Sequence, residues 1–110
     1  MAFQKIAKVA ELWSGEMISL ECEGQPVLLV NLDGAIRAYA DSCPHLRTRL
    51  SEGSLVGNEL VCSAHGWQFD ARTGEGINPR TACLKSFTVQ LENGDILLDI
   101  NKMRLQGYDG

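Results

Sequence analysis

The residues of this chain with the clearest chemical potential are two pairs that each combine a cysteine with a histidine. Cys43-Pro44-His45 is followed, after 16 residues, by Cys62-Ser63-Ala64-His65. The chain has only two histidines, and each stands within three residues of a cysteine. Thiolate sulfur and neutral imidazole nitrogen are ligands for zinc and for iron centres. The spacing therefore predicts a metal site whose ligands are Cys43, His45, Cys62 and His65.

Two kinds of metal site share this ligand composition. A structural zinc site usually takes two cysteines from one closely spaced pair and two histidines from another. Here each pair is mixed, and a single residue separates Cys43 from His45. Such a step would bring both side chains to one zinc ion only with strain. The same spacing suits two metal ions that lie close together, with both cysteines on one ion and both histidines on the other. A zinc-stabilised module is the alternative.

The pattern resembles that of the Rieske iron–sulfur family, in which two histidines replace two cysteines on one iron of a 2Fe–2S cluster. Two further segments are similar to a cluster-binding loop and the proline loop of that family: His65-Gly66-Trp67-Gln68-Phe69-Asp70 and Gly76-Ile77-Asn78-Pro79. The resemblance implies one Rieske-type 2Fe–2S cluster, held by thiolates on the buried iron and by imidazoles on the outer iron. It also implies an all-β Rieske fold, an antiparallel sandwich or barrel with an inserted cluster-binding subdomain.

Two departures from the respiratory members of the family concern the surroundings of the cluster. Those proteins carry an extra cysteine in each loop, and the two cysteines are joined as a disulfide. By the resemblance, Thr48 and Ala64 stand at these two positions in this chain. They also have a hydroxyl residue that donates a hydrogen bond to a cluster sulfur, where this chain has Trp67. Fewer donors stabilise the reduced cluster less, so we expect a reduction potential at the low end of the Rieske range, on the order of −150 mV.

Other segments resemble the ferredoxin component of bacterial aromatic (toluene-type) monooxygenases. They are Trp13 to Met17, Leu50 to Gly53, Gly76 to Pro79, and Cys83-Leu84. The resemblance implies a one-electron carrier, and not an enzyme in its own right, between an NADH-dependent flavin/iron–sulfur reductase and a diiron hydroxylase. Two other functions stay open, namely the ferredoxin of a ring-hydroxylating dioxygenase and a Rieske-like small subunit of a nitrite reductase.

Residues near the expected ligands are candidates for contact with redox partners. We expect a docking or supporting role for Leu46, Arg47, Gly66, Trp67 and Pro79. Trp67 fits equally well as an aromatic side chain that fills the core under the cluster loop. Cys22 and Cys83 match neither pair, and we interpret them as small hydrophobic residues or incidental thiols.

Short extended segments must position these residues. Residues 27–32 are typical of a strand buried on both faces, and Asp33-Gly34 predicts a hairpin turn to a strand over 35–40. Residues 86–91 alternate polar and apolar side chains, and Asn93-Gly94 predicts a second hairpin to a strand over 95–100. Residues 3–6 and 17–20 predict two more strands, and residues 8–12 a single helical turn.

The stretch between the two hairpins differs from them. Residues 41–82 are rich in Gly, Pro, Ser and Asn, contain few long apolar runs, and hold all four candidate ligands. A long stretch of this kind inside a compact domain is functional or is organised by something other than a core. We therefore predict one Rieske domain over residues 1–110, with base sheets at about 1–40 and 83–102 and a cluster-binding subdomain at about 41–82.

The overall composition argues against several classes of function. With 110 residues, 45% of them hydrophobic and 22% charged, the chain is typical of one globular domain. The formal net charge of −4 argues against nucleic acid as a partner, because phosphate binding needs a basic surface. No apolar run reaches the ~20 residues of a membrane span, and the N-terminal residues lack a secretory signal pattern. We expect a cytoplasmic monomer with no membrane partner.

Overall fold

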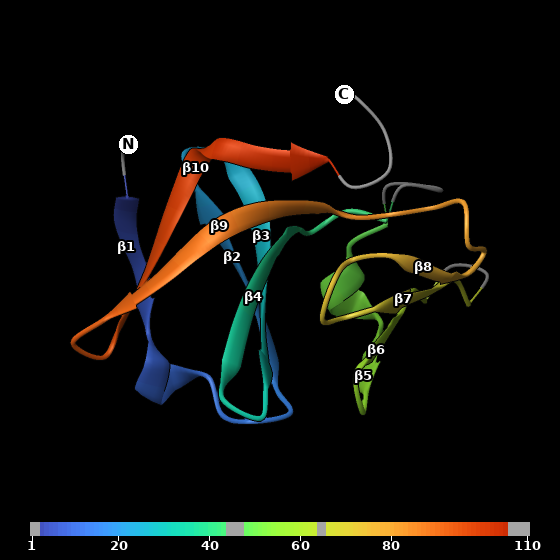
Figure 1. The fold of residues 1–110 in the computed structure, drawn as a ribbon, viewed down its shortest axis with the longest axis horizontal. Coiled ribbons are helices and arrows are strands. Elements are labelled where there is room, and N and C mark those ends of the chain that lie inside the picture. Colours follow the sequence, from blue (N-terminus) through green and yellow to red (C-terminus); the bar gives the residue numbers. More distant parts are fainter. Residues whose placement is uncertain (1–2, 44–47, 64–65, 106–110) are drawn as a thin grey trace.

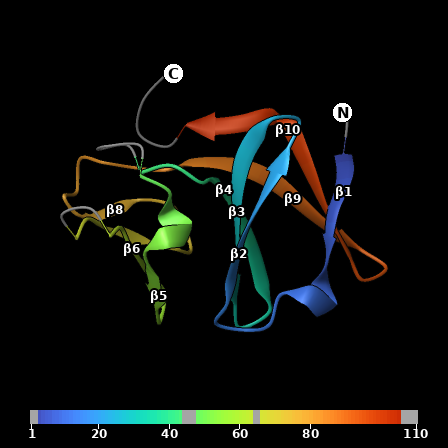
Figure 2. The same ribbon diagram turned by 180° about the vertical axis from the view of Figure 1, so that it is seen from behind.

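The computed structural model describes residues 3–43, 48–63 and 66–105, which form two antiparallel sheets (Figures 1 and 2). The strands of the large sheet are β1 (Phe3–Lys8), β2 (Met17–Cys22), β3 (Gln25–Leu32), β4 (Ala35–Ala40), β9 (Lys85–Glu92) and β10 (Asp95–Leu105). The small sheet contains β5 (Ser54–Val56), β6 (Glu59–Val61), β7 (Gln68–Asp70) and β8 (Gly76–Asn78). Their orders are β1–β10–β9–β4–β3–β2 and β5–β6–β7–β8. The expected all-β fold is confirmed.

Three tight turns set the pairing within the large sheet, and the one at Glu23-Gly24, which joins β2 to β3, was not predicted from the sequence. Asp33 and Gly34 have φ angles of 56° and 96°, and Asn93 and Gly94 have φ angles of 53° and 82°. Two-residue turns with both φ angles positive have the twist that antiparallel strands need. They pair β3 with β4 and β9 with β10, as the sequence predicted.

Strand β3 lies between two hydrophobic cores. Val27 and Leu29 belong to a core built by the large sheet and its connections, whereas Leu28 and Val30 belong to a second core shared with the small sheet. Successive residues of a strand point to opposite faces, which explains this alternation. All four side chains are fully buried. The prediction of a strand buried on both faces is therefore confirmed, and its second face is covered by the segment that follows β4.

That segment, residues 41–82, is named the lobe below. It lies beside β3 and β4 and contains the small sheet and one 3₁₀ turn, η2 (Leu50–Glu52) (Figures 1 and 2). The sequence predicted little regular structure here, yet Leu50, Leu60 and Phe69 form a buried centre. Strands of three residues are too short to show a repeating pattern, so the sequence did not indicate them.

Several elements differ in detail from expectation, and the strands expected over 3–6 and 17–20 extend to Lys8 and Cys22. The strand expected over 95–100 continues to Leu105, where β10 pairs again with the start of β9. The helical turn expected over 8–12 is a 3₁₀ turn, η1 (Val9–Glu11). Among the described residues, no helix has the length and apolar character needed to cross a membrane.

Candidate metal centre

Cys43 and Cys62 each open a short loop that is closed by the same kind of hydrogen bond. The backbone N–H of Cys43 donates to the carbonyl oxygen of Thr48, and that of Cys62 donates to the carbonyl oxygen of Trp67. Both N···O distances are 2.8 Å, and both bonds reach five residues ahead. Cys43 comes shortly after β4 and Cys62 directly after β6. The same five-residue hydrogen bond therefore starts at each of the two predicted cysteine ligands, in two distant parts of the sequence.

Both cysteines are buried in the same apolar surroundings. Cys43 is 0% exposed and Cys62 is 1% exposed, and both belong to the core cluster that contains Leu50, Leu60 and Phe69. Soft thiolate ligands in a site closed to water are suited to iron–sulfur clusters and to zinc. The described half of the predicted ligand set thus fits a sulfur-ligated metal group whose inner end is buried.

The other half of the predicted ligand set lies outside the described residues. His45 falls in the segment 44–47 and His65 in the segment 64–65, and the proposed docking residues Leu46 and Arg47 also fall in the first segment. Within the described residues, no group of three or more potential metal ligands occurs. The assignment of His45 and His65 as ligands therefore stays a prediction from the sequence.

Three residues expected near the partner-facing end are described. Gly66 is exposed with φ 67°, a conformation that favours glycine. Trp67 is half-buried and packs against the lobe core, with its ring centroid 6.4 Å from that of Phe69. Pro79 is half-buried, and a Cβ at Gly76 would lie 2.2 Å from its carbonyl oxygen, so the chain folds tightly here.

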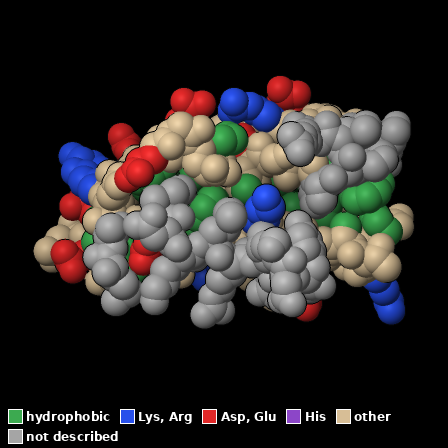
Figure 3. Space-filling model, turned by 90° about the horizontal axis from the view of Figure 1, so that it is seen from above, with side chains coloured by type: hydrophobic (Ala, Val, Ile, Leu, Met, Phe, Trp, Pro, Cys, Tyr) green, Lys and Arg blue, Asp and Glu red, His purple; other side chains and the backbone are tan. Residues whose placement is uncertain are grey.

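The surface over this end of the molecule is partly apolar. On the face drawn in Figure 3, hydrophobic side chains are visible toward the lobe, on the right of the view. In β8, Ile77 is 39% exposed. A single exposed apolar side chain is common by itself, but Ile77 stands two residues before the half-buried Pro79 and adds to a candidate contact surface.

The remaining two cysteines are not part of the site. Cys22 is 4% exposed in the core of the large sheet, and Cys83 is 8% exposed at a bridge with Glu75. Burial raises the pKa of both thiols, and a nearby carboxylate, Glu23 or Glu75, raises each further. A thiol with a raised pKa is a poor metal ligand, because the thiolate is the binding form. Their interpretation as small buried residues agrees with this environment.

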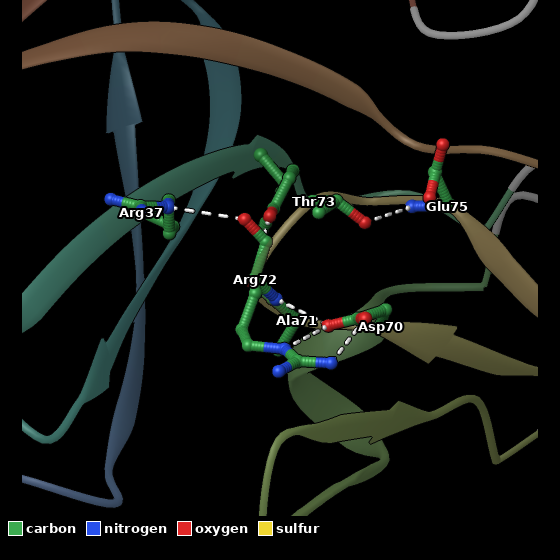
Figure 4. Close-up of polar contacts among 7 residues, drawn as sticks. Arg37, Asp70, Ala71, Arg72, Thr73 and Glu75 are labelled. Carbon is green, nitrogen blue, oxygen red and sulfur yellow. Dashed lines mark hydrogen bonds and ion pairs between the residues drawn. The ribbon is translucent and has the colours of Figure 1, made fainter.

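Contacts from β4 tie the lobe to the large sheet. The buried phenol of Tyr39 donates a hydrogen bond of 2.7 Å to the carbonyl oxygen of Ala71, and burial raises its pKa above the usual range. Nε of Arg37 donates to the carbonyl oxygen of Arg72 at 3.1 Å. In Figure 4, Arg72 folds back onto Asp70, and its hydrogen bonds to that carboxylate lower the pKa of Asp70. The turn between β7 and β8 is thereby held against β4.

A buried acidic residue stands shortly before Cys43 and was not predicted from the sequence. Asp41 is 1% exposed and stands two residues before Cys43. Its carboxylate accepts hydrogen bonds from Ser19 and Ser51, which are 22 and 10 residues away in the chain. The only signal in the sequence was an acidic residue between a buried strand and a candidate ligand. That signal does not distinguish a buried carboxylate from an exposed one.

Comparison with known proteins places the chain in a family. A family model described as Rieske [2Fe-2S] domain matches residues 2–88. The ferredoxin component of the alkene monooxygenase system of Xanthobacter autotrophicus (strain ATCC BAA-1158 / Py2) is 39% identical over 103 residues, which cover 93% of this chain and 84% of that protein. The ferredoxin component of biphenyl 2,3-dioxygenase from Rhodococcus jostii (strain RHA1) is 37% identical over 101 residues, which cover 91% and 94%.

Solved structures share the fold. The Sphingomonas yanoikuyae B1 ferredoxin has a TM-score of 0.81 at 26% sequence identity, covering 89% of this chain and 98% of its own. A chain from the complex of reduced oxygenase and oxidized ferredoxin in carbazole 1,9a-dioxygenase has a TM-score of 0.80 at 26% identity, covering 87% and 91%.

These similarities agree with the geometry of the site. The family match spans Cys43 and Cys62, and their two buried thiols have the chemistry that the sulfur ligands of a cluster of this type require. The cofactor is therefore a Rieske-type 2Fe–2S cluster, and the zinc-stabilised module is excluded. The chain belongs to the family of Rieske [2Fe-2S] domains.

Proposed function

We propose that this chain is a monomeric, cytoplasmic one-electron carrier of a bacterial aromatic (toluene-type) monooxygenase. It receives electrons from an NADH-dependent flavin/iron–sulfur reductase and passes them to a diiron hydroxylase. The observation that carries the proposal is the 39% identity, over 93% of the chain, to the ferredoxin component of an alkene monooxygenase system. In this proposal residues 1–110 act as a single domain, and the lobe is its cluster-binding subdomain.

The four ligands have distinct roles in this proposal. When bound, the cluster takes up and releases a single electron. The thiolates of Cys43 and Cys62 offset the positive charge of the oxidised iron–sulfur core, which limits the net charge that the buried site must hold. The imidazoles of His45 and His65 would hold the other iron and would give the electron a route to a redox partner. No bond to a substrate is made or broken, so the chain is a carrier component and not a catalyst.

Partner contact is proposed at the end of the lobe. Leu46, Arg47, Gly66, Trp67 and Pro79 are the residues assigned to it. The exposed Gly66 and Ile77 and the hydrophobic side chains visible there in Figure 3 support an apolar contribution to docking. An apolar contact would make electron transfer less sensitive to salt than a contact between charges, because screening acts on charges.

Electron transfer to isolated partners tests the proposal. The protein, reduced under anaerobic conditions, is mixed with a diiron hydroxylase and its effector protein, and the return of the oxidised visible spectrum is followed. We expect rapid single-phase reoxidation by the diiron hydroxylase, and little by a ring-hydroxylating oxygenase. A low midpoint potential, on the order of −150 mV, is expected for the same sample. Reoxidation only by the ring-hydroxylating oxygenase would overturn the monooxygenase assignment.

A second candidate function is supported by a specific observation. The biphenyl 2,3-dioxygenase ferredoxin component of Rhodococcus jostii is 37% identical over 91% of this chain, which is close to the value for the alkene monooxygenase ferredoxin. A ferredoxin for a ring-hydroxylating dioxygenase would use the same cluster and the same lobe. The mixing experiment separates the two, because only the accepting oxygenase differs.

A further inference from the structure

The carboxylate of Asp41 is buried and saturated with hydrogen bonds from two other elements. Ser51 donates to it twice, from its backbone N–H to Oδ1 at 2.9 Å and from Oγ to Oδ2 at 2.7 Å. Ser19 of β2 donates from Oγ to Oδ2 at 2.6 Å, and Nη1 of Arg49 lies 3.9 Å from the same oxygen. Burying a carboxylate is costly unless donors replace water. Asp41, at 1% exposure, is therefore bound firmly to both elements.

The contact to Ser51 leads on to the second cysteine loop. Ser51 lies in η2, and Gly53 is the C-cap residue of this turn. A Cβ built on Gly53 would lie 1.9 Å from the carbonyl oxygen of Val61 and 3.2 Å from the backbone nitrogen of Ser63. Those two residues flank Cys62, so the backbone at the end of η2 is pressed directly against the backbone that carries this ligand.

A continuous connection thus runs between the two predicted cysteine ligands. It begins at Asp41, two residues before Cys43, crosses to Ser51 through two hydrogen bonds, and reaches the backbone around Cys62 through the close contact of Gly53. The 3₁₀ turn is compact, because the N–H of Gly53 donates to the carbonyl of Leu50 at 2.9 Å. A short, hydrogen-bonded turn transmits position better than a flexible loop would.

We propose that Asp41 is a positioning residue for the cluster, which it serves by fixing the Cys43 loop relative to the Cys62 loop through Ser51. Both sulfur ligands of one iron must be held at a set separation, and residues behind the ligands set it. The connection consists only of groups of the chain itself. The inference rests on Cys43 and Cys62 as ligands, and it is independent of which oxygenase accepts the electron.

The test compares serines that donate to the same carboxylate oxygen. S51A removes the Oγ hydrogen bond within the connection, whereas the matched control S19A removes a hydrogen bond to Oδ2 from β2 and leaves the connection intact. Holoprotein of each variant is incubated with an iron chelator, and iron release is timed. The EPR spectrum of the reduced protein reports the ligand geometry, and thermal unfolding reports general stability.

We expect S51A to release iron about fivefold faster than wild type, equivalent to about 1 kcal/mol at 1.4 kcal/mol per tenfold change. Its EPR features should broaden or shift, since the cysteine loops take up a range of separations. S51T keeps the hydroxyl and should restore both the rate and the spectrum. S19A should lower thermal stability yet keep the wild-type release rate and spectrum. D41N, which turns an amide N–H toward donors, should show the defect of S51A in stronger form.

Two results would overturn the inference. If S51A keeps the release rate and the EPR spectrum of the wild type, the connection does not position the ligands. If S19A and S51A accelerate release equally, the carboxylate acts only through general stability. A wild-type protein without a Rieske EPR signal would overturn the ligand assignment itself, so the two failures are distinguishable. S51A and S51T decide the matter even if D41N does not fold.

Discussion

The strands of the large sheet have six to eleven residues, whereas each strand of the small sheet has three. The large sheet is held by long ladders and by a core that its own strands and connections supply. The lobe has its own core and short ladders, and single contacts add to them: the phenol of Tyr39, the carboxylate of Asp41 and close backbone approaches at Gly53 and Gly76. We therefore expect the first region to keep its fold when one contact is lost, and the second to depend more on its few contacts and on its cofactor.

The two regions also differ in how independent they are. The core of the lobe includes Leu28, Val30 and Tyr39 from the large sheet, but the core of the large sheet contains no residue of the lobe among the described residues. The packing of the lobe therefore depends on the large sheet, but the packing of the large sheet does not depend on the lobe. The large sheet is expected to form without the lobe, whereas the lobe needs the sheet to complete its core.

Removal of the cluster should produce the largest difference in stability between the lobe and the large sheet. Ligand-free protein, made by chelation or as C62S, should lose amide protection in β6 and β7 by about a hundredfold or more, because metal binding supplies folding free energy to its site. Protection in β9 and β10 should change little. Hydrogen exchange with mass spectrometry measures both. C22S is the matched cysteine control, and an equal loss of protection in both sheets would contradict the comparison.

G53A should have the next largest effect. A methyl group there would lie 1.9 Å from the carbonyl oxygen of Val61, so the backbone must move, and we expect a loss of about 3 kcal/mol in the free energy of unfolding. G57A is the control in the same lobe, with open space around it but a positive φ of 61°, and should cost about 1 kcal/mol. Urea denaturation gives both values, and equal losses would show that the close contact is unimportant.

Y39F tests the joint between the regions. Loss of the hydrogen bond to the carbonyl of Ala71 should cost about 1–2 kcal/mol, because that buried oxygen loses its donor. Burial raises the pKa of Tyr39, so its contribution is complete below about pH 10, the usual tyrosine value, and is lost as the pH rises toward the folded-state pKa. Denaturation at pH 8 and pH 10.5 should show a smaller pH effect in Y39F than in wild type, and an identical effect would refute this.

The ion pair at the β7–β8 turn should contribute least. Hydrogen bonds from Arg72 lower the pKa of Asp70, so the pair adds stability above the usual aspartate pKa and loses it as the pH falls through the folded-state value. The pair is partly exposed, and solvent weakens such interactions. R72Q should therefore change stability near pH 7 less than Y39F does, with the difference from wild type vanishing at low pH. Thermal unfolding across acidic pH checks this.

The difference between the large sheet and the lobe also explains which features could be predicted from the sequence. The large sheet follows from local signals, since Asp33-Gly34 and Asn93-Gly94 define hairpins and the flanking residues alternate or are continuously apolar. The cysteine pairs could be recognised from their spacing alone. The role of Asp41 could not, because its partners Ser19 and Ser51 lie 22 and 10 residues away, and contacts at that separation depend on the finished fold.

Strand β3 places neighbouring residues under different constraints. Val27 and Leu29 serve the core of the large sheet, and Leu28 and Val30 serve the core that surrounds the cysteines. A mutational scan along these four positions should therefore alternate between two phenotypes: aggregation of a chain that no longer folds, and a folded, colourless chain that no longer retains iron. Alternate residues of this one strand thus determine two different properties, the folding of the large sheet and the retention of the iron.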